Sequence, residues 1–472
     1  MNVWKRIISS SVIYLGVRFS FGILSNFIFY FIFSPTALLL IKRAELFLRL
    51  PVILNFGASK YIATQGIKGE LDKSLISNFL ILKITTYSVL VLSLFFYQDL
   101  NLRIIDYVLL GVLLFLGILA NYFNNLSYLQ DKIHYLIDAQ SIITVFSPAF
   151  VYGFGSFFDF SGWITYSIIF QIINLLYLFR VAKKEFFLID LKLFSVKKLY
   201  QILRNSFFLD LNSRLSAFFE IFIFFFLTNF ISVTESAILV FITRTSDSIV
   251  KLSGNTINKK ISHSIVSLTK NKFELADLKN SLGFQSIGYF FVSITISIVY
   301  GLFVFFFIEN FKDYSHLVLL SGLMSYLRLM NQNIILFLFA RNLFQDIRNL
   351  FFFCFFIYMV NVFFLVFLGN EVNFYHICYS LVVISLFKLI ISFVFLVKAL
   401  NSINILNNLL PSFFLIIGLC SLSLFEHEIL NINLYYFSLF FLMLGIFMIK
   451  SFFSDSLNFI RMIKNTLLKE DA

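Results

Sequence analysis

TRTSDSIVKL, residues Thr243 to Leu252, is a polar interruption near the middle of a long apolar segment. It places Arg244, Asp247 and Lys251 at positions i, i+3 and i+7, which share one face of an α-helix. An ionisable side chain at bilayer depth costs about 2.5–3.5 kcal/mol on insertion scales. The stripe therefore predicts a membrane helix whose charged face points into protein or into a water-filled cavity.

The same cation–acid–cation order occurs once more, much earlier in the chain. Lys42, Glu45 and Arg49 repeat the spacing inside the apolar segment from Thr36 to Phe56. Two such stripes in separate apolar segments favour a chain built from a duplicated half.

The composition is that of a polytopic integral membrane protein. Hydrophobic residues make up 60% of the 472 residues and charged residues only 13%, against about 25% charged in globular proteins. The net charge of +12 would suit nucleic acid, but its distribution along the chain fits membrane topology better. We therefore expect no nucleic-acid partner.

A helix needs about 20 predominantly apolar residues to cross a bilayer. Fourteen such stretches occur, at 7–33, 36–56, 75–97, 104–124, 139–158, 160–180, 205–231, 235–257, 284–308, 315–340, 349–369, 375–398, 409–425 and 433–451. The sequence thus predicts an all-α fold of about fourteen transmembrane helices.

Lysine and arginine set the expected orientation, because they concentrate in cytoplasmic loops. With both termini cytoplasmic, the outer loops contain only Arg103 and Lys312, and the inner loops and tail hold the rest of the loop cations. The inner loop Val181–Asn205 mixes apolar and basic residues at helical spacing, which indicates an interfacial helix on an anionic leaflet. It follows the sixth span, where a linker between two six-helix halves belongs.

Motifs of enzymatic chemistry are missing from the sequence. It contains no G-x-x-x-x-G-K-[ST], H-E-x-x-H or G-x-S-x-G motif. Cys354, Cys378 and Cys420 have no metal-like spacing. The outer loops are too short to hold a catalytic domain, so we expect a non-enzyme with no metal and no cofactor.

Intramembrane charge is the remaining signal. Lys83 and Lys388 each lie alone near a span end, so we expect them to pair locally or to extend to the interface. The two stripes each keep a net positive charge after internal pairing. Excess cations facing a shared cavity make an anion site, and the planar fork of arginine suits phosphate.

Three segments resemble one family of membrane transporters. They are IYLGVRFSFGIL (Ile13–Leu24), FLRLPVILNFGASKYIATQ (Phe47–Gln65) and FFEIFIFFFLTNFISVTESAILVF (Phe218–Phe241). With the span count and basic central loop, they are similar to the polysaccharide-unit flippases of the multidrug/oligosaccharidyl-lipid/polysaccharide exporter superfamily. SPTALLL (Ser34–Leu40) departs from the family, which often has an acid followed by Gly and an aromatic there.

The resemblance implies two pseudo-repeated six-helix bundles around a central cavity, with two additional C-terminal helices. The expected divisions are 1–180 for the first bundle, 181–204 for the cytoplasmic amphipathic linker, 205–400 for the second bundle, 401–452 for the additional helices and 453–472 for a cytoplasmic tail.

The implied substrate is an oligosaccharide joined through pyrophosphate to a polyprenyl carrier, which is flipped across a bacterial inner membrane for O-antigen or capsule assembly. The residues expected to line its cavity are Arg18, Lys42, Arg49, Arg214, Arg244, Lys251 and Arg328, with Glu45, Glu220 and Asp247 as orienting or proton-coupling acids. We expect a monomer in contact with membrane lipids, with a polysaccharide polymerase as a candidate partner.

Three other functions remain open at this point. A cation-coupled multidrug exporter of the same superfamily should have an acidic or aromatic cavity. A membrane enzyme of polysaccharide polymerisation is disfavoured by the short loops. A flippase for the peptidoglycan precursor should be essential for growth.

Overall fold

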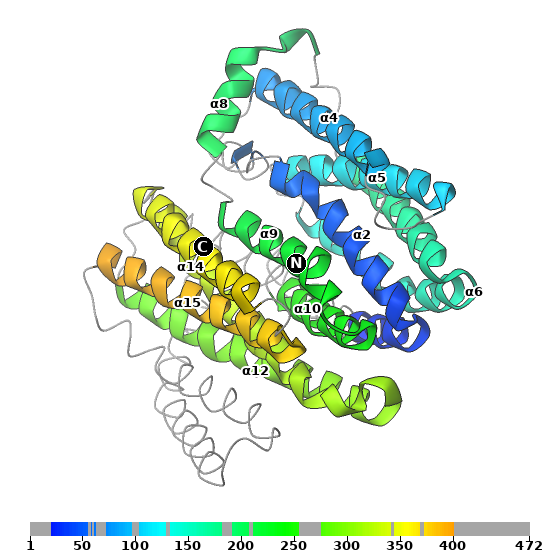
Figure 1. Ribbon diagram of the computed structural model, residues 1–472. Coiled ribbons are helices and arrows are strands. Elements are labelled where there is room, and N and C mark those ends of the chain that lie inside the picture. Colours follow the sequence, from blue (N-terminus) through cyan, green and yellow to red (C-terminus); the bar gives the residue numbers. More distant parts are fainter. Residues whose placement is uncertain are drawn as a thin grey trace, which may run out of the picture. The chain divides into compact units, whose positions relative to one another are not determined.

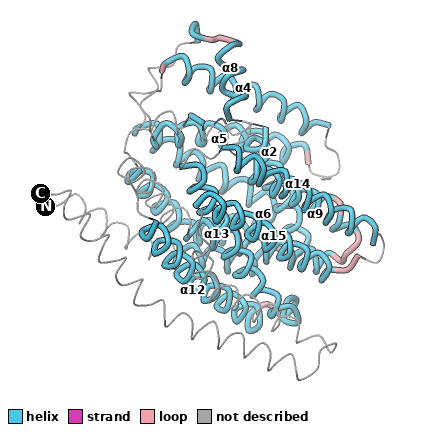
Figure 2. The backbone as a smooth tube through the Cα atoms, turned by 90° about the vertical axis from the view of Figure 1, so that its left-hand side faces the viewer, coloured by secondary structure: helices cyan, strands magenta, loops and turns pink. Residues whose placement is uncertain are grey.

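The protein is helical throughout the part of the chain that the structure describes. The computed structural model describes residues 20–54, 58, 61–62, 72–96, 103–128, 133–181, 191–206, 211–253, 275–340, 344–368 and 372–400. No strand occurs in these ranges (Figure 2). The predicted all-α class is therefore confirmed for them.

The helices follow one another with short connections. Their bounds are Ser20–Ile32, α2 Pro35–Leu54, α4 Lys73–Phe96, α5 Ile104–Tyr128, α6 Ile133–Val181, η2 Leu191–Leu193, α8 Val196–Ser206, α9 Leu211–Phe225, η3 Leu227–Asn229, α10 Val233–Ser253, α12 Leu275–Phe307, η5 Glu309–Leu317, α13 Val318–Ala340, α14 Phe344–Leu368 and α15 Phe374–Leu400, where η marks a 3-10 helix (Figure 1).

Helical residues coincide with each of the first twelve predicted spans, while 409–425 and 433–451 lie outside the described residues. Five helical segments are long and apolar enough to cross a membrane: Lys73–Leu92, Ile104–Phe123, Ile143–Phe179, Gln345–Leu368 and Phe374–Lys398. Shorter apolar helices occupy Ser20–Ile32, Ala217–Asn229 and Val292–Phe307. The chain is thus a multi-pass membrane protein, and the total of fourteen spans stays a prediction.

Polar side chains set where several helices begin. The Ala37 amide donates to Ser34 Oγ at 3.2 Å ahead of α2. At the start of α10, the Ser232 amide donates to Glu235 Oε2 at 2.9 Å, and the Glu235 amide donates to Ser232 Oγ at 3.2 Å. This reciprocal pair is a capping box, which satisfies two amides that the first helical turn leaves without partners.

Two of the predicted spans, 139–158 and 160–180, form one continuous element with a sharp kink. Asp159, between them, has φ 49° and ψ −124°, so the helix of α6 is interrupted at that residue. A Cβ at Gly162 would meet the carbonyl of Phe154, so only glycine fits where the chain folds back on itself.

The chain forms two compact units, Met1–Val240 and Phe241–Ala472. In the first unit, α5 packs on α6, α2 on α9, and α4 on α5 and α8. In the second, α13 packs on α12 and α15, and α14 packs on α15. The division at 180 and 205 expected from the sequence stays a prediction.

Contacts within each unit join loops that the topology prediction assigns to the same side. They are Lys198–Asp72 at 2.7 Å, Ser161–Asp106 at 2.8 Å, Lys398–Asp346 at 3.9 Å and the ring pair Tyr314–Phe374 with centroids 5.5 Å apart. These contacts agree with the predicted alternation of loops between two sides. The cytoplasmic location of the termini stays a prediction.

Small residues bring α12 and α13 close together. A Cβ at Gly322 would lie 2.8 Å from the Ser293 carbonyl oxygen and would also collide with Ser297 Oγ. Ser297 Oγ and Ser321 Oγ are 3.2 Å apart across the same interface. Small side chains therefore allow close backbone packing here, as is common between membrane helices.

We predict that Gly322→Ala destabilises the protein by about 1–3 kcal/mol, because a backbone carbonyl cannot move out of the way of the new methyl group. Gly117→Ala is the matched control, since nothing lies within 4 Å of its Cβ position. It should be neutral or stabilising by about 0.5–1 kcal/mol. Thermal unfolding of both purified variants in one detergent provides the comparison, and equal shifts would refute the close packing.

Candidate functional site

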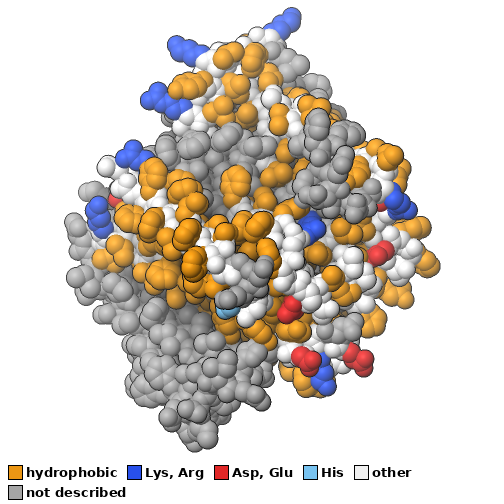
Figure 3. Space-filling model, viewed as in Figure 1, with side chains coloured by type: hydrophobic (Ala, Val, Ile, Leu, Met, Phe, Trp, Pro, Cys, Tyr) orange, Lys and Arg blue, Asp and Glu red, His pale blue; other side chains and the backbone are white. Residues whose placement is uncertain are grey.

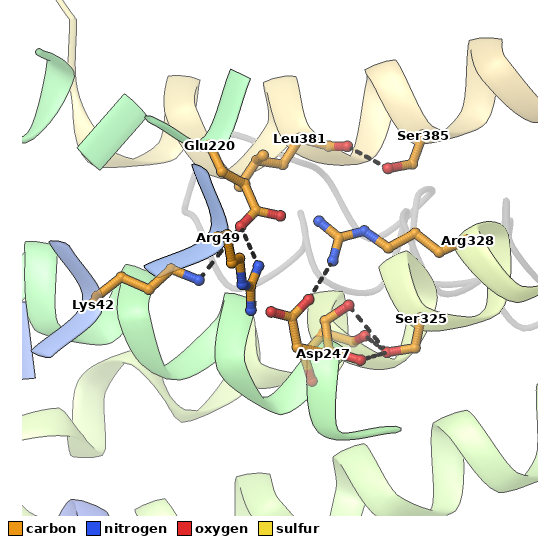
Figure 4. Close-up of polar contacts among 10 residues, drawn as sticks. Lys42, Arg49, Glu220, Asp247, Ser325, Arg328, Leu381 and Ser385 are labelled. Carbon is orange, nitrogen blue, oxygen red and sulfur yellow. Dashed lines mark hydrogen bonds and ion pairs between the residues drawn. The ribbon is translucent and has the colours of Figure 1, made fainter. Parts of the chain in front are cut away.

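The first charged cluster joins α2 to α9. Lys42 Nζ lies 3.5 Å and Arg49 Nη1 lies 3.2 Å from the same carboxylate oxygen, Oε2 of Glu220 (Figure 4). Lys42 and Arg49 are seven residues apart on α2, so they share the face that meets α9. The stripe predicted from the sequence is thus directed at another helix, which supplies the acid.

The members of this cluster differ in their access to solvent. The side chain of Lys42 is 0% exposed and that of Glu220 is 6% exposed, whereas the side chain of Arg49 is 32% exposed. Lys42 Nζ also lies 5.1 Å from the centroid of the Phe224 ring, which adds a cation–π contact. A buried ion pair therefore supports an arginine whose guanidinium stays partly accessible.

Arg43, which neighbours Lys42 in sequence, binds the C-terminal end of α9. Its Nε donates to the Phe224 carbonyl at 3.0 Å, and its Nη2 donates to Thr228 Oγ1 at 3.2 Å and Asn229 Oδ1 at 3.3 Å. The last carbonyls of a helix lack intrahelical partners and carry partial negative charge. Arg43 therefore caps α9. The sequence did not reveal this role, because an unbroken apolar run hides where α9 ends.

The second cluster lies within the second unit. Arg328 Nη1 of α13 lies 2.9 Å from Asp247 Oδ1 of α10, with side chains 21% and 14% exposed (Figure 4). One turn before Arg328, Ser325 Oγ lies 3.2 Å from both the carbonyl oxygen and Oγ of Ser246. The second predicted stripe is thus also joined to another helix, again by an arginine.

The structure accounts for part of the predicted cavity set. Lys42, Arg49 and Glu220 come together in the first unit, and Asp247 and Arg328 come together in the second. Glu45 on α2 and Arg244 on α10 are half-buried, and Nη1 of Arg244 is buried. Arg18 and the side chains of Arg214 and Lys251 lie outside the described residues.

Lys83 of α4 corrects the expectation that it extends to the interface. Its side chain is buried, and Nζ donates to Asn121 Oδ1 of α5 at 2.9 Å. The ammonium also lies 5.0 Å from the Phe79 ring centroid. The packing of α5 against α4 supplies Asn121, and this interhelical contact could not be located from one sequence.

Metal-binding chemistry finds no support within the described ranges. No group of three or more His, Cys, Asp or Glu residues there could hold a metal ion. Cys354 and Cys378 are buried free thiols, and Cys420 lies outside those ranges. The chemistry that these residues offer is recognition of charge.

Comparison with known proteins assigns no relative. The sequence matches no protein-family model, and no curated protein is significantly similar to it. The charged clusters themselves therefore carry the functional argument.

We predict that Glu220→Leu destabilises the protein by about 3–5 kcal/mol, because it leaves the buried ammonium of Lys42 without its carboxylate. The double substitution Lys42→Met/Glu220→Leu removes both charges and should recover most of the loss. Thermal unfolding of the purified chains gives the comparison.

Asp346→Ala serves as a control for this series, because it breaks the exposed Lys398–Asp346 pair. It should change the free energy of unfolding by less than about 1 kcal/mol. A double variant no more stable than Glu220→Leu would show that the Lys42–Glu220 pair is not the source of the loss.

Proposed function

We propose that the protein is a polysaccharide-unit flippase of the multidrug/oligosaccharidyl-lipid/polysaccharide exporter superfamily. It would move a polyprenyl-pyrophosphate-linked oligosaccharide across the bacterial inner membrane for O-antigen or capsule assembly. The observation that carries the proposal is the cationic cluster of α2 and α9, in which Arg49 remains accessible beside the buried Lys42–Glu220 pair.

Charge supports an anionic substrate. The ionisable residues of α2 together with Glu220 comprise three cations and two acids, Lys42, Arg43, Arg49, Glu45 and Glu220. Their sum is one net positive charge, as 3 − 2 = 1. A guanidinium can donate two parallel hydrogen bonds to a phosphate.

Accessibility follows one trend in both clusters. Arg49 is more exposed than Glu220, and Arg328 is more exposed than Asp247. In each cluster the acid fixes the arginine from its buried side and leaves part of the guanidinium reachable. This arrangement suits an arginine that binds an incoming phosphate without losing its support.

The contact between α2 and α9 also suits alternating access. In the predicted division, α2 belongs to the first bundle and α9 to the second, so the Glu220 contacts would join the two bundles. A pyrophosphate that bound Arg49 would compete with Glu220 for it. Substrate binding would then weaken the contact that holds these helices together, and the bundles could rearrange without any covalent chemistry.

The remaining features of the proposal follow from the same topology. The chain would act as a monomer with both termini in the cytoplasm. The lipid tail of the substrate would stay in the bilayer while its sugars, which cannot cross hydrocarbon, passed through a polar interior. A polysaccharide polymerase would use the product on the outer face.

We predict that Arg49→Ala reduces translocation of the lipid-linked oligosaccharide at least about 30-fold, because losing one charged partner costs about 2 kcal/mol or more. Arg49→Lys should restore part of the activity. Surface polysaccharide in a deletion strain, normalised to the amount of protein in the membrane, measures the effect.

The matched control is Arg103→Ala, which removes an exposed arginine that pairs with Asp106 at the start of α5. It should leave surface polysaccharide unchanged. Normal polysaccharide with Arg49→Ala would remove Arg49 from the mechanism. A deletion strain with normal polysaccharide and increased drug susceptibility would instead support a multidrug exporter.

A further inference from the structure

The amphipathic helix α8 is fixed to the beginning of α4. Lys198 Nζ of α8 lies 2.7 Å from Asp72 Oδ2, immediately before α4. Asn78 of α4 accepts a hydrogen bond from the Ser195 amide at 3.0 Å and donates one to the Leu193 carbonyl at 3.3 Å. Three polar contacts thus hold both the start of α8 and the turn before it.

The ionisation of Asp72 agrees with this attachment. Partial burial favours its protonated form, but hydrogen bonds from Lys198 and the Leu75 amide, with the charge of Lys198, together lower the pKa of the carboxyl below its ordinary value. Asp72 is therefore ionised at neutral pH, and the pair with Lys198 is intact there.

The attachment determines which face of α8 points outward. Ile202 is buried in the core cluster that also contains Phe79 of α4. Lys197, Tyr200 and Arg204 lie on the opposite side and are exposed. Because α8 is held by polar contacts at its start and by apolar packing near its end, it cannot rotate to bury this outward face.

The position of α8 along α4 matters as much as its rotation. The segment Lys73–Leu92 of α4 is long and apolar enough to cross a membrane. The contacts of Lys198 with Asp72 and of Leu193 with Ser74 place α8 at the end where this segment begins. In a bilayer that end lies at the level of the lipid headgroups.

The outward surface combines cations with exposed apolar side chains. We define the α8 surface as Leu193, Phe194, Val196, Lys197, Tyr200 and Arg204, all of which are exposed. Figure 3 shows lysine and arginine side chains among hydrophobic ones over this part of the protein. Within the described residues, neither Lys197 nor Arg204 forms an ion pair.

We propose that the α8 surface binds the anionic phospholipid leaflet on the side where α4 begins. Lys197 and Arg204 would contact lipid phosphates, and Val196 and Tyr200 would enter the boundary between headgroups and acyl chains. This combination is typical of interfacial helices, whose affinity adds apolar burial to attraction by anionic lipid. Lys198 is a positioning residue, because its ammonium is engaged by Asp72.

Hydrogen exchange of residues 191–206 in the full-length protein tests the proposal. The protein is placed in nanodiscs of phosphatidylcholine alone, or of phosphatidylcholine mixed with phosphatidylglycerol. We expect exchange to be slower in the anionic nanodiscs, by up to about 30-fold, since each cation near an anionic surface contributes roughly five-fold.

Three variants separate the roles of the cations. Lys197→Gln/Arg204→Gln should abolish the difference between the two lipid compositions, while exchange in the rest of the chain stays unchanged. Lys198→Gln should speed exchange in both compositions, because it loosens α8 from α4. Lys312→Gln, which removes a cation far along the chain from α8, should leave the difference intact.

Two results would overturn the proposal. One is equal exchange of residues 191–206 in neutral and anionic nanodiscs. The other is equal slowing by inorganic phosphate in phosphatidylcholine nanodiscs, which would indicate a site for free anions. Neither result bears on the flippase proposal, which rests on α2 and α9.

Discussion

The buried pair of Lys42 and Glu220 is the interaction on which the charged site depends. A lysine without any exposed surface is tolerable inside an apolar helix contact only when a carboxylate lies within a few ångströms. Glu220 meets this need and also contacts Arg49. The pair fixes how α2 and α9 face each other, and it leaves the guanidinium of Arg49 as the accessible part of the cluster.

The second unit uses the same chemistry with different partners. Asp247 of α10 holds Arg328 of α13, and Ser325 bonds to Ser246 one turn away, so charge and hydroxyl contacts align the two helices. Arg43 and Lys83 show that other intramembrane cations are structural, since they bind a helix end and an asparagine. Only a subset of the cations is therefore available for an anionic substrate.

Helix positions could be predicted from the sequence because apolar runs and their polar breaks are local signals. The break at Asp159 and the helix start at Ser34 are examples. The partners of the charges could not be predicted, because Lys42 and Glu220 are 178 residues apart and only packing brings them together. Lys83 was misjudged for the same reason, since its partner Asn121 belongs to another helix.

The central claim is that the charged face of α2 meets water inside the protein while apolar faces meet lipid. Its most direct test uses a chain in which Cys354, Cys378 and Cys420 are replaced by alanine, with a single new cysteine from Arg49→Cys or Phe356→Cys. Both positions are solvent-exposed when no bilayer surrounds the protein. In membranes, a charged, membrane-impermeant thiol reagent should label position 49 and spare position 356. Labelling of both positions to the same extent, or of position 356 alone, would contradict the account.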